Sequence, residues 1–320
     1  MGKGGSGKTT LAASFITYLT MSQQEQQVLA IDADVNMHLQ KALGMTGEAL
    51  SLSANVGDIF AYLEGERHEW QQLDLASLPT FGSIPPSHAS RFISVHIQNA
   101  FLRRYALLQD RLALCTVGTH QHEDVSHSCY HNKLNVLEAV LHHLLDTERE
   151  VVVVDSTAGV DNLGTSLFMA YDLTLFVVEP TKKSLRVFLE YEQQLQPYQL
   201  QVKAIINKVQ HEDDIRFVQD YLAEDALLGS LTYSEHLKAF EQGKPEARYR
   251  FIHENQGLWE LIVASLRQHP RDWTAYQHLL QTLFQKECQS WWDQYYGQDL
   301  GQIISPSFRY QDVLKQEVRG

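Results

Sequence analysis

Short apolar runs separated by helical stretches are the feature that most constrains how this chain can fold. The runs are rich in Val, Ile and Leu and occupy residues 28–31, 112–117, 151–154, 173–178 and 202–206. Continuous apolar runs of this length are typical of strands buried on both faces, as in a parallel sheet between layers of helices. Helices are predicted between them over residues 9–21, 133–145 and 184–195. We therefore expect an α/β fold with a mostly parallel sheet covered by helices.

The strand signal stops near Gly243 and Pro245, and this divides the chain in two. Residues 1–245 are predicted to form the α/β domain, and residues 246–320 a helical C-terminal extension whose tryptophans are expected in its core. Residues 50–112 contain Pro79, Pro85 and Pro86 with weak periodicity, which is typical of inserted helices and loops.

The overall charge excludes some classes of partner. The 320 residues include 39 acidic and 26 basic side chains, giving a formal charge of −13. Such a field repels nucleic acid, and no apolar run approaches the roughly 18 residues of a membrane span. With three cysteines and no charged-then-apolar leader, we expect a cytoplasmic protein that binds neither nucleic acid nor membrane.

The first ten residues, MGKGGSGKTT, form a glycine-rich motif. Gly2 is followed by four residues and then by Gly7-Lys8-Thr9, which matches the pattern G-x-x-x-x-G-K-[ST] of a phosphate-binding loop. Glycines allow backbone N–H groups to surround an anion, and the helix that follows adds its positive end. Lys8 is expected to reach the β- and γ-phosphates, and the Thr9 hydroxyl to bind Mg²⁺. The full predicted phosphate site is Gly4, Gly5, Ser6, Gly7, Lys8, Thr9 and Thr10.

Only Met1 precedes this loop, although a phosphate loop normally follows a central strand. We expect sequence upstream of Met1 to supply that strand. The alternative is a chain that lacks its first strand, in which two neighbouring strands lose a hydrogen-bonding partner. Such a chain would be an inactive nucleotide-binding remnant.

Acidic residues follow two of the predicted strands. Asp32 and Asp34 come after the first, and Asp155 ends the run of four valines. Ligands of parallel α/β sheets bind at the carboxyl ends of the strands, where these side chains are expected. Asp155 is predicted to hold Mg²⁺ together with Thr9, and Gly159 to let the following loop approach the γ-phosphate.

Lys3, within KGGSGKTT, makes the loop resemble the deviant phosphate loop of the ParA/MinD family of ATPases. The resemblance implies a P-loop fold and a nucleotide-dependent homodimer in which Lys3 reaches the partner's phosphates. It also implies that Asp34 orients the attacking water and Asp32 supports the magnesium shell. Asn36 would belong to the first switch segment, and Asn207, in IINKV, would recognise adenine.

The order of motifs, with VEPTKKS and GSLTYSEHL, is most similar to the nickel-insertion ATPases of carbon monoxide dehydrogenase maturation. In that branch a Cys-x-Cys pair from each subunit binds a metal at the dimer interface. Here the corresponding residues are Cys129-Tyr130-His131. Two Cys129/His131 pairs across a twofold axis would give a Cys₂His₂ set suited to Zn²⁺ or Ni²⁺. The alternative is a polar loop with solvated histidines and a buried Cys129.

These observations predict a Mg²⁺-dependent, ATP-hydrolysing dimeric switch that assembles a metal centre in a client enzyme. The alternative is a partitioning or positioning ATPase of the ParA/MinD type. His142 and His143, on the helix after Cys129, are expected on the protein surface.

Overall fold

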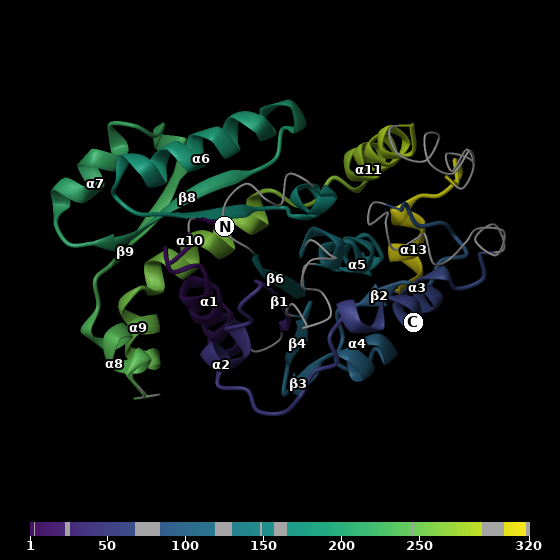
Figure 1. The fold of residues 1–320 in the computed structure, drawn as a ribbon, viewed down its shortest axis with the longest axis horizontal. Helices are drawn as coiled ribbons and strands as arrows, with labels where there is room; N and C mark the ends of the chain where they lie inside the picture. Colours follow the sequence, from purple (N-terminus) through teal and green to yellow (C-terminus); the bar gives the residue numbers. More distant parts are fainter. Residues whose placement is uncertain are drawn as a thin grey trace.

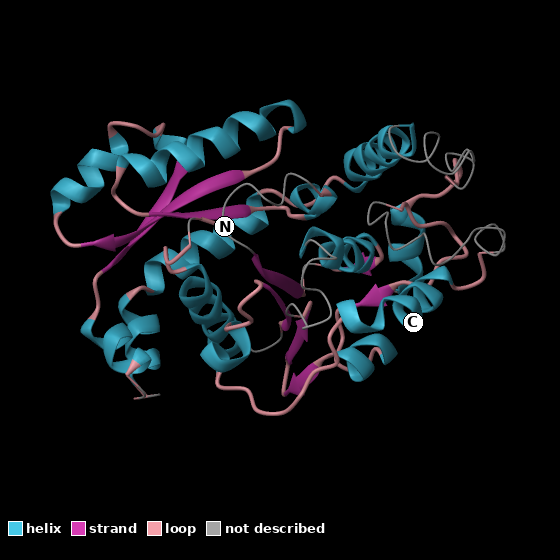
Figure 2. Cartoon of the chain, in the orientation of Figure 1, coloured by secondary structure: helices cyan, strands magenta, loops and turns pink. Residues whose placement is uncertain are grey.

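The computed structural model describes residues 1–2, 4–22, 26–67, 84–118, 130–147, 149–156, 165–242, 244, 246–289 and 304–317. Two sheets form the centre of this part of the chain, with helices on their faces (Figures 1 and 2). The first sheet has the order β3-β4-β1-β6, and the second has the order β7-β8-β9. A pair of two-residue strands, β2 and β5, lies apart from both.

The strand bounds agree with all five predicted runs. The first sheet contains β1 (Gln27–Ala33), β3 (Leu107–Gln109), β4 (Leu112–Thr116) and β6 (Glu150–Ser156). The second contains β7 (Thr174–Val178), β8 (Val202–Val209) and β9 (Leu227–Thr232), and the small pair is β2 (Ile93–Ser94) with β5 (Leu144–Leu145). All these pairings are parallel except that of β3 with β4. The predicted mostly parallel α/β fold is confirmed.

The α-helices bounded within the described residues surround these strands. They are α1 (Lys8–Ser22), α2 (Leu39–Leu43), α3 (Val56–Glu64), α4 (Ala100–Tyr105), α5 (Tyr130–His142), α6 (Lys182–Leu195), α7 (Glu212–Gln219), α8 (Glu235–Glu241), α9 (Ala247–Glu254), α10 (Gln256–Gln268), α11 (Trp273–Glu287) and α13 (Tyr310–Glu317). The helices α3 and α4 come from the segment that was predicted to be an insertion of helices and loops.

Alternating side chains of β1 build two different cores. Leu29 and Ile31 pack in one cluster with α3, α4 and α5, whereas Val28 and Ala30 pack in another with α1. This period of two is the geometry of a strand between two helical layers. In the second sheet, α6 and α7 cover one face and α10 the other (Figure 1). Burial on both faces explains why these strands are continuously apolar.

The two sheets meet at the first residues of the chain. The Met1 carbonyl accepts a hydrogen bond from Val177 N at 2.7 Å, and Gly2 forms a parallel bridge with Val177. Within the described residues β6 pairs with β1 alone, and β7 pairs with β8 and this short segment. Met1 and Gly2 therefore lie beside β7. An upstream strand at this position stays a prediction.

The helices after residue 246 pack against the α/β domain in two places. Trp259 of α10 is fully buried in the same cluster as α1 and Val177, and its Nε1 donates to Ile252 O at 2.9 Å. The later helices α11 and α13 contact each other, and α11 contacts the 3₁₀ turn Ser166–Ala170. The predicted boundary at residue 245 stays a prediction.

The expectation that His142 and His143 lie on the surface is wrong. Both side chains are fully buried: Tyr276 and Tyr310, from α11 and α13, cover His142, and the Phe92 ring packs against His143. The two ring nitrogens of His142 contact the Tyr276 hydroxyl at 2.6 Å and the Ser166 hydroxyl at 2.9 Å. Burial lowers the pKa of His142 to about 3, so this histidine is neutral. These contacts come from residues distant in the sequence, which helical periodicity does not reveal.

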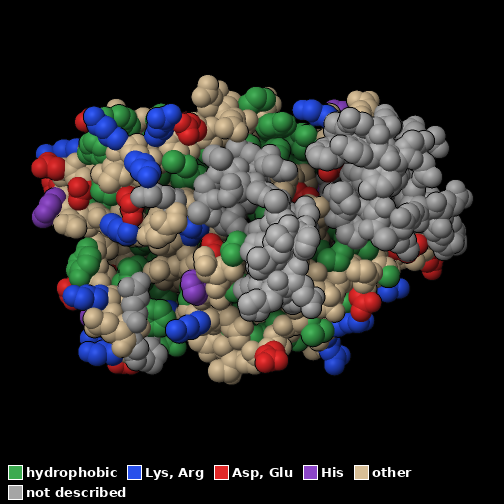
Figure 3. Space-filling model, viewed as in Figure 1, with side chains coloured by type: hydrophobic (Ala, Val, Ile, Leu, Met, Phe, Trp, Pro, Cys, Tyr) green, Lys and Arg blue, Asp and Glu red, His purple; other side chains and the backbone are tan. Residues whose placement is uncertain are grey.

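The visible surface mixes charges of both signs. On the face shown in Figure 3, Lys and Arg side chains are interspersed with Asp and Glu side chains. Among the described residues, no helix has the length and apolar character needed to cross a bilayer.

Candidate functional site

A cavity of about 630 Å³ lies between the N-terminal loop and the ends of β8 and β9. Its walls include most of the predicted phosphate and switch residues, namely Gly4, Gly5, Gly7, Lys8, Thr9, Thr10, Asp34, Asn36 and Asn207. The other lining residues are His38, Lys208, Gln210, Thr232, Tyr233, Ser234, Leu237 and Lys238. The structure thus brings residues more than 200 positions apart to one cavity.

The loop can surround an anion only because glycines occupy its tightest positions. Gly5 and Gly7 have φ values of 77° and 98°, which side chains rarely adopt. A Cβ on Gly7 would lie 2.2 Å from Asn207 Nδ2, so a larger residue would displace the Asn207 side chain as well as strain the backbone. Helix α1 begins directly after Gly7, at Lys8. Its N-terminal N–H groups and dipole favour a bound phosphate.

Asp32 is the penultimate residue of β1 and Asp34 directly follows the strand, at the edge predicted from the sequence. Asp32 is fully buried and accepts hydrogen bonds from Leu39 N at 2.9 Å and Asp34 N at 3.2 Å. Burial raises the pKa of Asp32 to about 7, and the Asp155 carboxylate adds to this shift. Asp34 lines the cavity and accepts from the backbone N–H and the side-chain amide of Asn36, both at 2.9 Å. Asp32 therefore shapes the turn, whereas Asp34 faces the cavity.

Asp155 is aligned with Asp32 across the β1–β6 pair. It is 2% exposed, and burial raises its pKa while a hydrogen bond from the Thr9 hydroxyl acts in the opposite direction. Its Oδ2 has no hydrogen-bond partner among the described residues, and neither has the buried hydroxyl of Ser6. Buried polar atoms are nearly always paired, so these two atoms indicate a missing ligand. A carboxylate and a threonine hydroxyl are oxygen donors that suit Mg²⁺ beside a bound phosphate.

Lys208 and Glu179 are site residues that the sequence analysis missed. Lys208 Nζ donates to Gly5 O at 2.9 Å and forms an ion pair with Glu179. Its neighbour Asn207 donates from Nδ2 to Ser6 O at 2.7 Å. The only signal in the sequence was a polar Asn-Lys pair after an apolar strand, which says nothing about a contact with the first residues of the chain.

Several predicted site residues lie outside the described part of the chain. Lys3, Cys129 and Gly159 are among them, and His131 falls in the first turn of α5 with its side chain not described. Among the described residues, no group of three or more His, Cys, Asp or Glu is arranged to hold a metal ion. The proposed Cys129/His131 metal site therefore stays a prediction.

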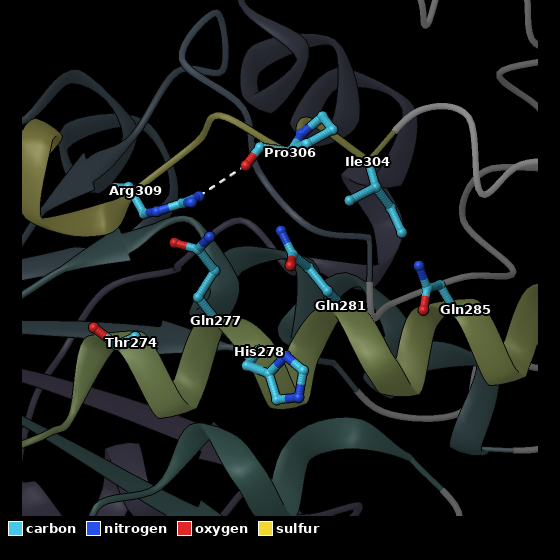
Figure 4. Close-up of a pocket in the computed structure, with 8 residues that line it drawn as sticks. All are labelled: Thr274, Gln277, His278, Gln281, Gln285, Ile304, Pro306 and Arg309. Carbon is cyan, nitrogen blue, oxygen red and sulfur yellow. Dashed lines mark hydrogen bonds between the residues drawn. The ribbon is translucent and has the colours of Figure 1, made fainter.

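A second cavity of about 440 Å³ lies between α11 and residues 304–309. Gln277, Gln281 and Gln285 rise from successive turns of α11 toward this segment (Figure 4). Gln277 is buried and donates to Phe308 O at 2.7 Å, and Arg309 donates to Pro306 O at 2.8 Å. The bond from Gln277 fastens the segment to α11, and none of the predicted site residues lies here.

Known proteins resemble this chain over the same region. The carbon monoxide dehydrogenase accessory protein CooC of Rhodospirillum rubrum is 26% identical over 75% of this chain and 85% of its own length. An uncharacterized ATP-binding protein of Methanocaldococcus jannaschii is 27% identical over 76% of this chain and 88% of its own. A putative plasmid partition protein of Borrelia burgdorferi, solved with AMPPNP, has 15% identity and a TM-score of 0.48, covering 82% of this chain and 95% of its own. The profile of the CobQ/CobB/MinD/ParA nucleotide binding domain matches residues 1–246, and this chain belongs to that family.

Proposed function

We propose that this protein binds ATP with Mg²⁺ and hydrolyses it, and that it uses this cycle as a dimeric switch in the assembly of a metal centre. The observation that carries the proposal is the cavity in which a glycine-rich loop faces Asp34, while Thr9 of the cavity wall bonds to the buried Asp155 at the end of β6. The loop would hold the phosphates, and Thr9 with Asp155 would hold Mg²⁺. Magnesium supplies charge neutralisation at the phosphates when it is bound.

Asp34 is the candidate for orienting the attacking water. It lies at the cavity wall with its carboxylate held by Asn36, whereas Asp32 is buried and committed to backbone N–H groups. Phosphoryl transfer requires positioning and charge stabilisation more than covalent chemistry. A fixed carboxylate beside the loop meets that requirement. Lys3 is proposed to act on the phosphates bound by the partner subunit, and closure of the dimer would then depend on ATP.

The direct test is nucleotide affinity of the full chain, measured by calorimetry with ATP and ADP in the presence of Mg²⁺. Lys8→Ala is expected to weaken ATP binding about 100-fold, equivalent to about 2.7 kcal/mol, because it removes the cation at the β- and γ-phosphates. Lys41→Ala, on α2 outside the cavity, is the matched control and should bind normally. A wild-type chain that binds neither nucleotide at millimolar concentration would contradict the proposal.

The metal-assembly part of the proposal rests on the similarity to CooC and on the Cys129-x-His131 sequence. A thiolate and an imidazole from each of two subunits make a tetrahedral set suited to Zn²⁺ or Ni²⁺. We expect about one metal ion per nucleotide-bound dimer. Cys129→Ala should abolish metal binding and leave ATP affinity intact, whereas Cys288→Ala, a buried cysteine of the C-terminal helices, should retain the metal. Stoichiometric metal in Cys129→Ala would contradict this site.

A partitioning or positioning function is the second candidate, since the matched family includes ParA and MinD. Such proteins would act through a DNA or membrane surface. The net charge of −13 disfavours binding to either polyanion or anionic lipid. ATP-dependent co-sedimentation with DNA or with anionic vesicles at physiological salt would favour this second function over metal assembly.

A further inference from the structure

We propose that Asn207 and Lys208 are positioning residues that brace the phosphate loop, so that its N–H groups are oriented before a nucleotide arrives. This inference rests on the proposed nucleotide-binding function. The two side chains hold consecutive carbonyls of the loop, because Asn207 Nδ2 donates to Ser6 O at 2.7 Å and Lys208 Nζ to Gly5 O at 2.9 Å.

Because of peptide geometry, these two contacts fix the direction of N–H groups in the loop. A trans peptide carries its C=O and its N–H in opposite directions. A donor that holds Gly5 O therefore fixes the direction of the Ser6 N–H, and a donor that holds Ser6 O fixes that of the Gly7 N–H. Both N–H groups belong to the turn that would surround the phosphates. Without these two contacts, a loop with three glycines among residues 4–7 has wide backbone freedom.

The strand is deformed to place the two side chains. From Ile206 to Val209, β8 advances three residues while β9 advances two, from Ser230 to Thr232. This extra residue is a β-bulge, a feature that re-aims side chains next to functional sites. Lys208 has φ of 62°, the left-handed region that costs a lysine about 1 kcal/mol or more. Local strain of this kind persists where the surrounding contacts hold it, as the bonds to the loop do here.

Glu179 keeps the lysine at the loop. Its side chain is 18% exposed and forms the ion pair with Lys208. Glu179 itself is fixed in the turn between β7 and α6, where its N–H donates to the Ser184 hydroxyl at 3.0 Å. The Lys208 ammonium group thus contacts the Glu179 carboxylate and the Gly5 carbonyl at the same time. A lysine whose role was to bind the phosphates directly would not need to be fixed in this way before the nucleotide binds.

The test compares Lys208→Met with Lys203→Met, a matched loss on the same strand. Lys203 also donates to a carbonyl, Asp225 O at 2.5 Å, but lies outside the cavity. Lys208→Met should weaken ADP binding about tenfold, as expected for one charge-assisted hydrogen bond. In the absence of nucleotide, amide exchange of residues 4–9 should accelerate about tenfold in Lys208→Met and stay unchanged in Lys203→Met.

Further variants separate bracing from charge effects. Lys208→Arg should restore part of the affinity, because a guanidinium also donates to a carbonyl. The double variant Glu179→Gln/Lys208→Met should remain about tenfold weaker than wild type, since removing the carboxylate does not restore the hydrogen bond to Gly5. Full recovery in the double variant would show that Lys208 only neutralises Glu179 and would overturn the proposal.

Two other results would also overturn it. One is weaker ADP binding by Lys208→Met with unchanged loop exchange in the free protein, which would mean that Lys208 contacts the nucleotide directly. The other is equal loop exchange in Lys208→Met and wild type together with equal affinity. The exchange measurement needs no nucleotide, so a wild-type chain that fails to bind ADP would contradict the proposed function and leave the brace testable.

Discussion

The cavity at the N-terminal loop and the junction around Arg271, Asp146 and Asp172 both contain charges that are largely shielded from solvent, but the two regions satisfy these charges differently. At the cavity, Asp155 Oδ2 and Ser6 Oγ have no hydrogen-bond partner among the described residues. At the junction, the partly buried Arg271 makes two bonds to Asp172, at 2.7 and 3.0 Å, and a third to Ala170 O at 2.9 Å. At the cavity these two polar atoms are unpaired, whereas at the junction the Arg271 guanidinium is bonded to the groups around it.

The junction pairs its charges with one another, although Asp146 Oδ1 makes no hydrogen bond among the described residues and lies 3.8 Å from Arg271 Nη1. Burial alone would lower the pKa of Arg271, but Asp146 and Asp172 together raise it. The guanidinium also lies over the rings of Trp273 and Tyr276, at 4.9 Å from each centroid. Buried charges with such partners are structural, whereas buried carboxylates beside an open cavity indicate a ligand site. The comparison predicts opposite effects on stability for changes in the two regions.

The largest effect on stability is expected at the junction. Arg271→Met should lower the free energy of unfolding by about 1.5–3 kcal/mol, because it removes charge-assisted hydrogen bonds and leaves two partly buried carboxylates without their cation. Urea unfolding of the full chain measures this loss, and the exposed Arg186→Met should change it by less than about 0.5 kcal/mol. An unchanged midpoint for Arg271→Met would remove the distinction between the two regions.

At the cavity, Asp155→Asn should separate activity from stability. The neutral amide removes the cost of a buried carboxylate, so the free protein should be at least as stable as wild type. Mg²⁺-dependent ATP hydrolysis should fall about 100-fold or more, because the variant removes the proposed magnesium ligand. Thermal unfolding and phosphate release measure the two effects. A variant that is both active and less stable would place Asp155 with the structural charges.

The smallest effect should be a pH dependence at Asp32. Its pKa is about 7 in the folded chain and 3.8 in the reference state, so the folded state retains a proton that the unfolded state has lost. Wild-type stability should therefore fall as pH rises from about 4 to about 7 and then level off. Asp32→Asn removes this loss, and its gain over wild type should be larger at pH 8 than at pH 5, by about 1–2 kcal/mol.

The measurement is urea unfolding of nucleotide-free protein at both pH values. Asp58→Asn, an exposed residue paired with Arg104, is the control and should shift stability by less than about 1 kcal/mol at either pH. A pH-independent difference between Asp32→Asn and wild type would show that Asp32 carries its charge in the folded chain without cost.

The sequence revealed the elements whose burial is uniform and missed those defined by distant contacts. The runs of β1, β4, β6, β7 and β8 are apolar because both faces are covered, and this pattern is local. Strand β9, with the sequence LLGSLT, contains Gly229 and two polar residues and escaped prediction. The loop, Asp32, Asp34 and Asp155 could be located from the sequence because they lie at the ends of predicted elements, and their roles stay predictions.

What could not be predicted depends on side chains that meet across the fold. His142 is buried because Tyr276 and Tyr310 come from helices far along the chain. Lys208 reaches Gly5 over a separation of 203 residues, and only because a bulge turns it there. The periodicity of a sequence indicates which face of a helix or strand a residue occupies. It does not indicate which distant residue that side chain contacts in the fold.

The attachment of the loop has a mechanical consequence. Gly2, through Val177, and Gly5 and Ser6, through Lys208 and Asn207, tie the loop to the second sheet, while Asp32 and Asp155 belong to the first. The loop and the carboxylates of the site are thus attached to different sheets. A shift of one sheet relative to the other would therefore change the distance between the loop and the two carboxylates.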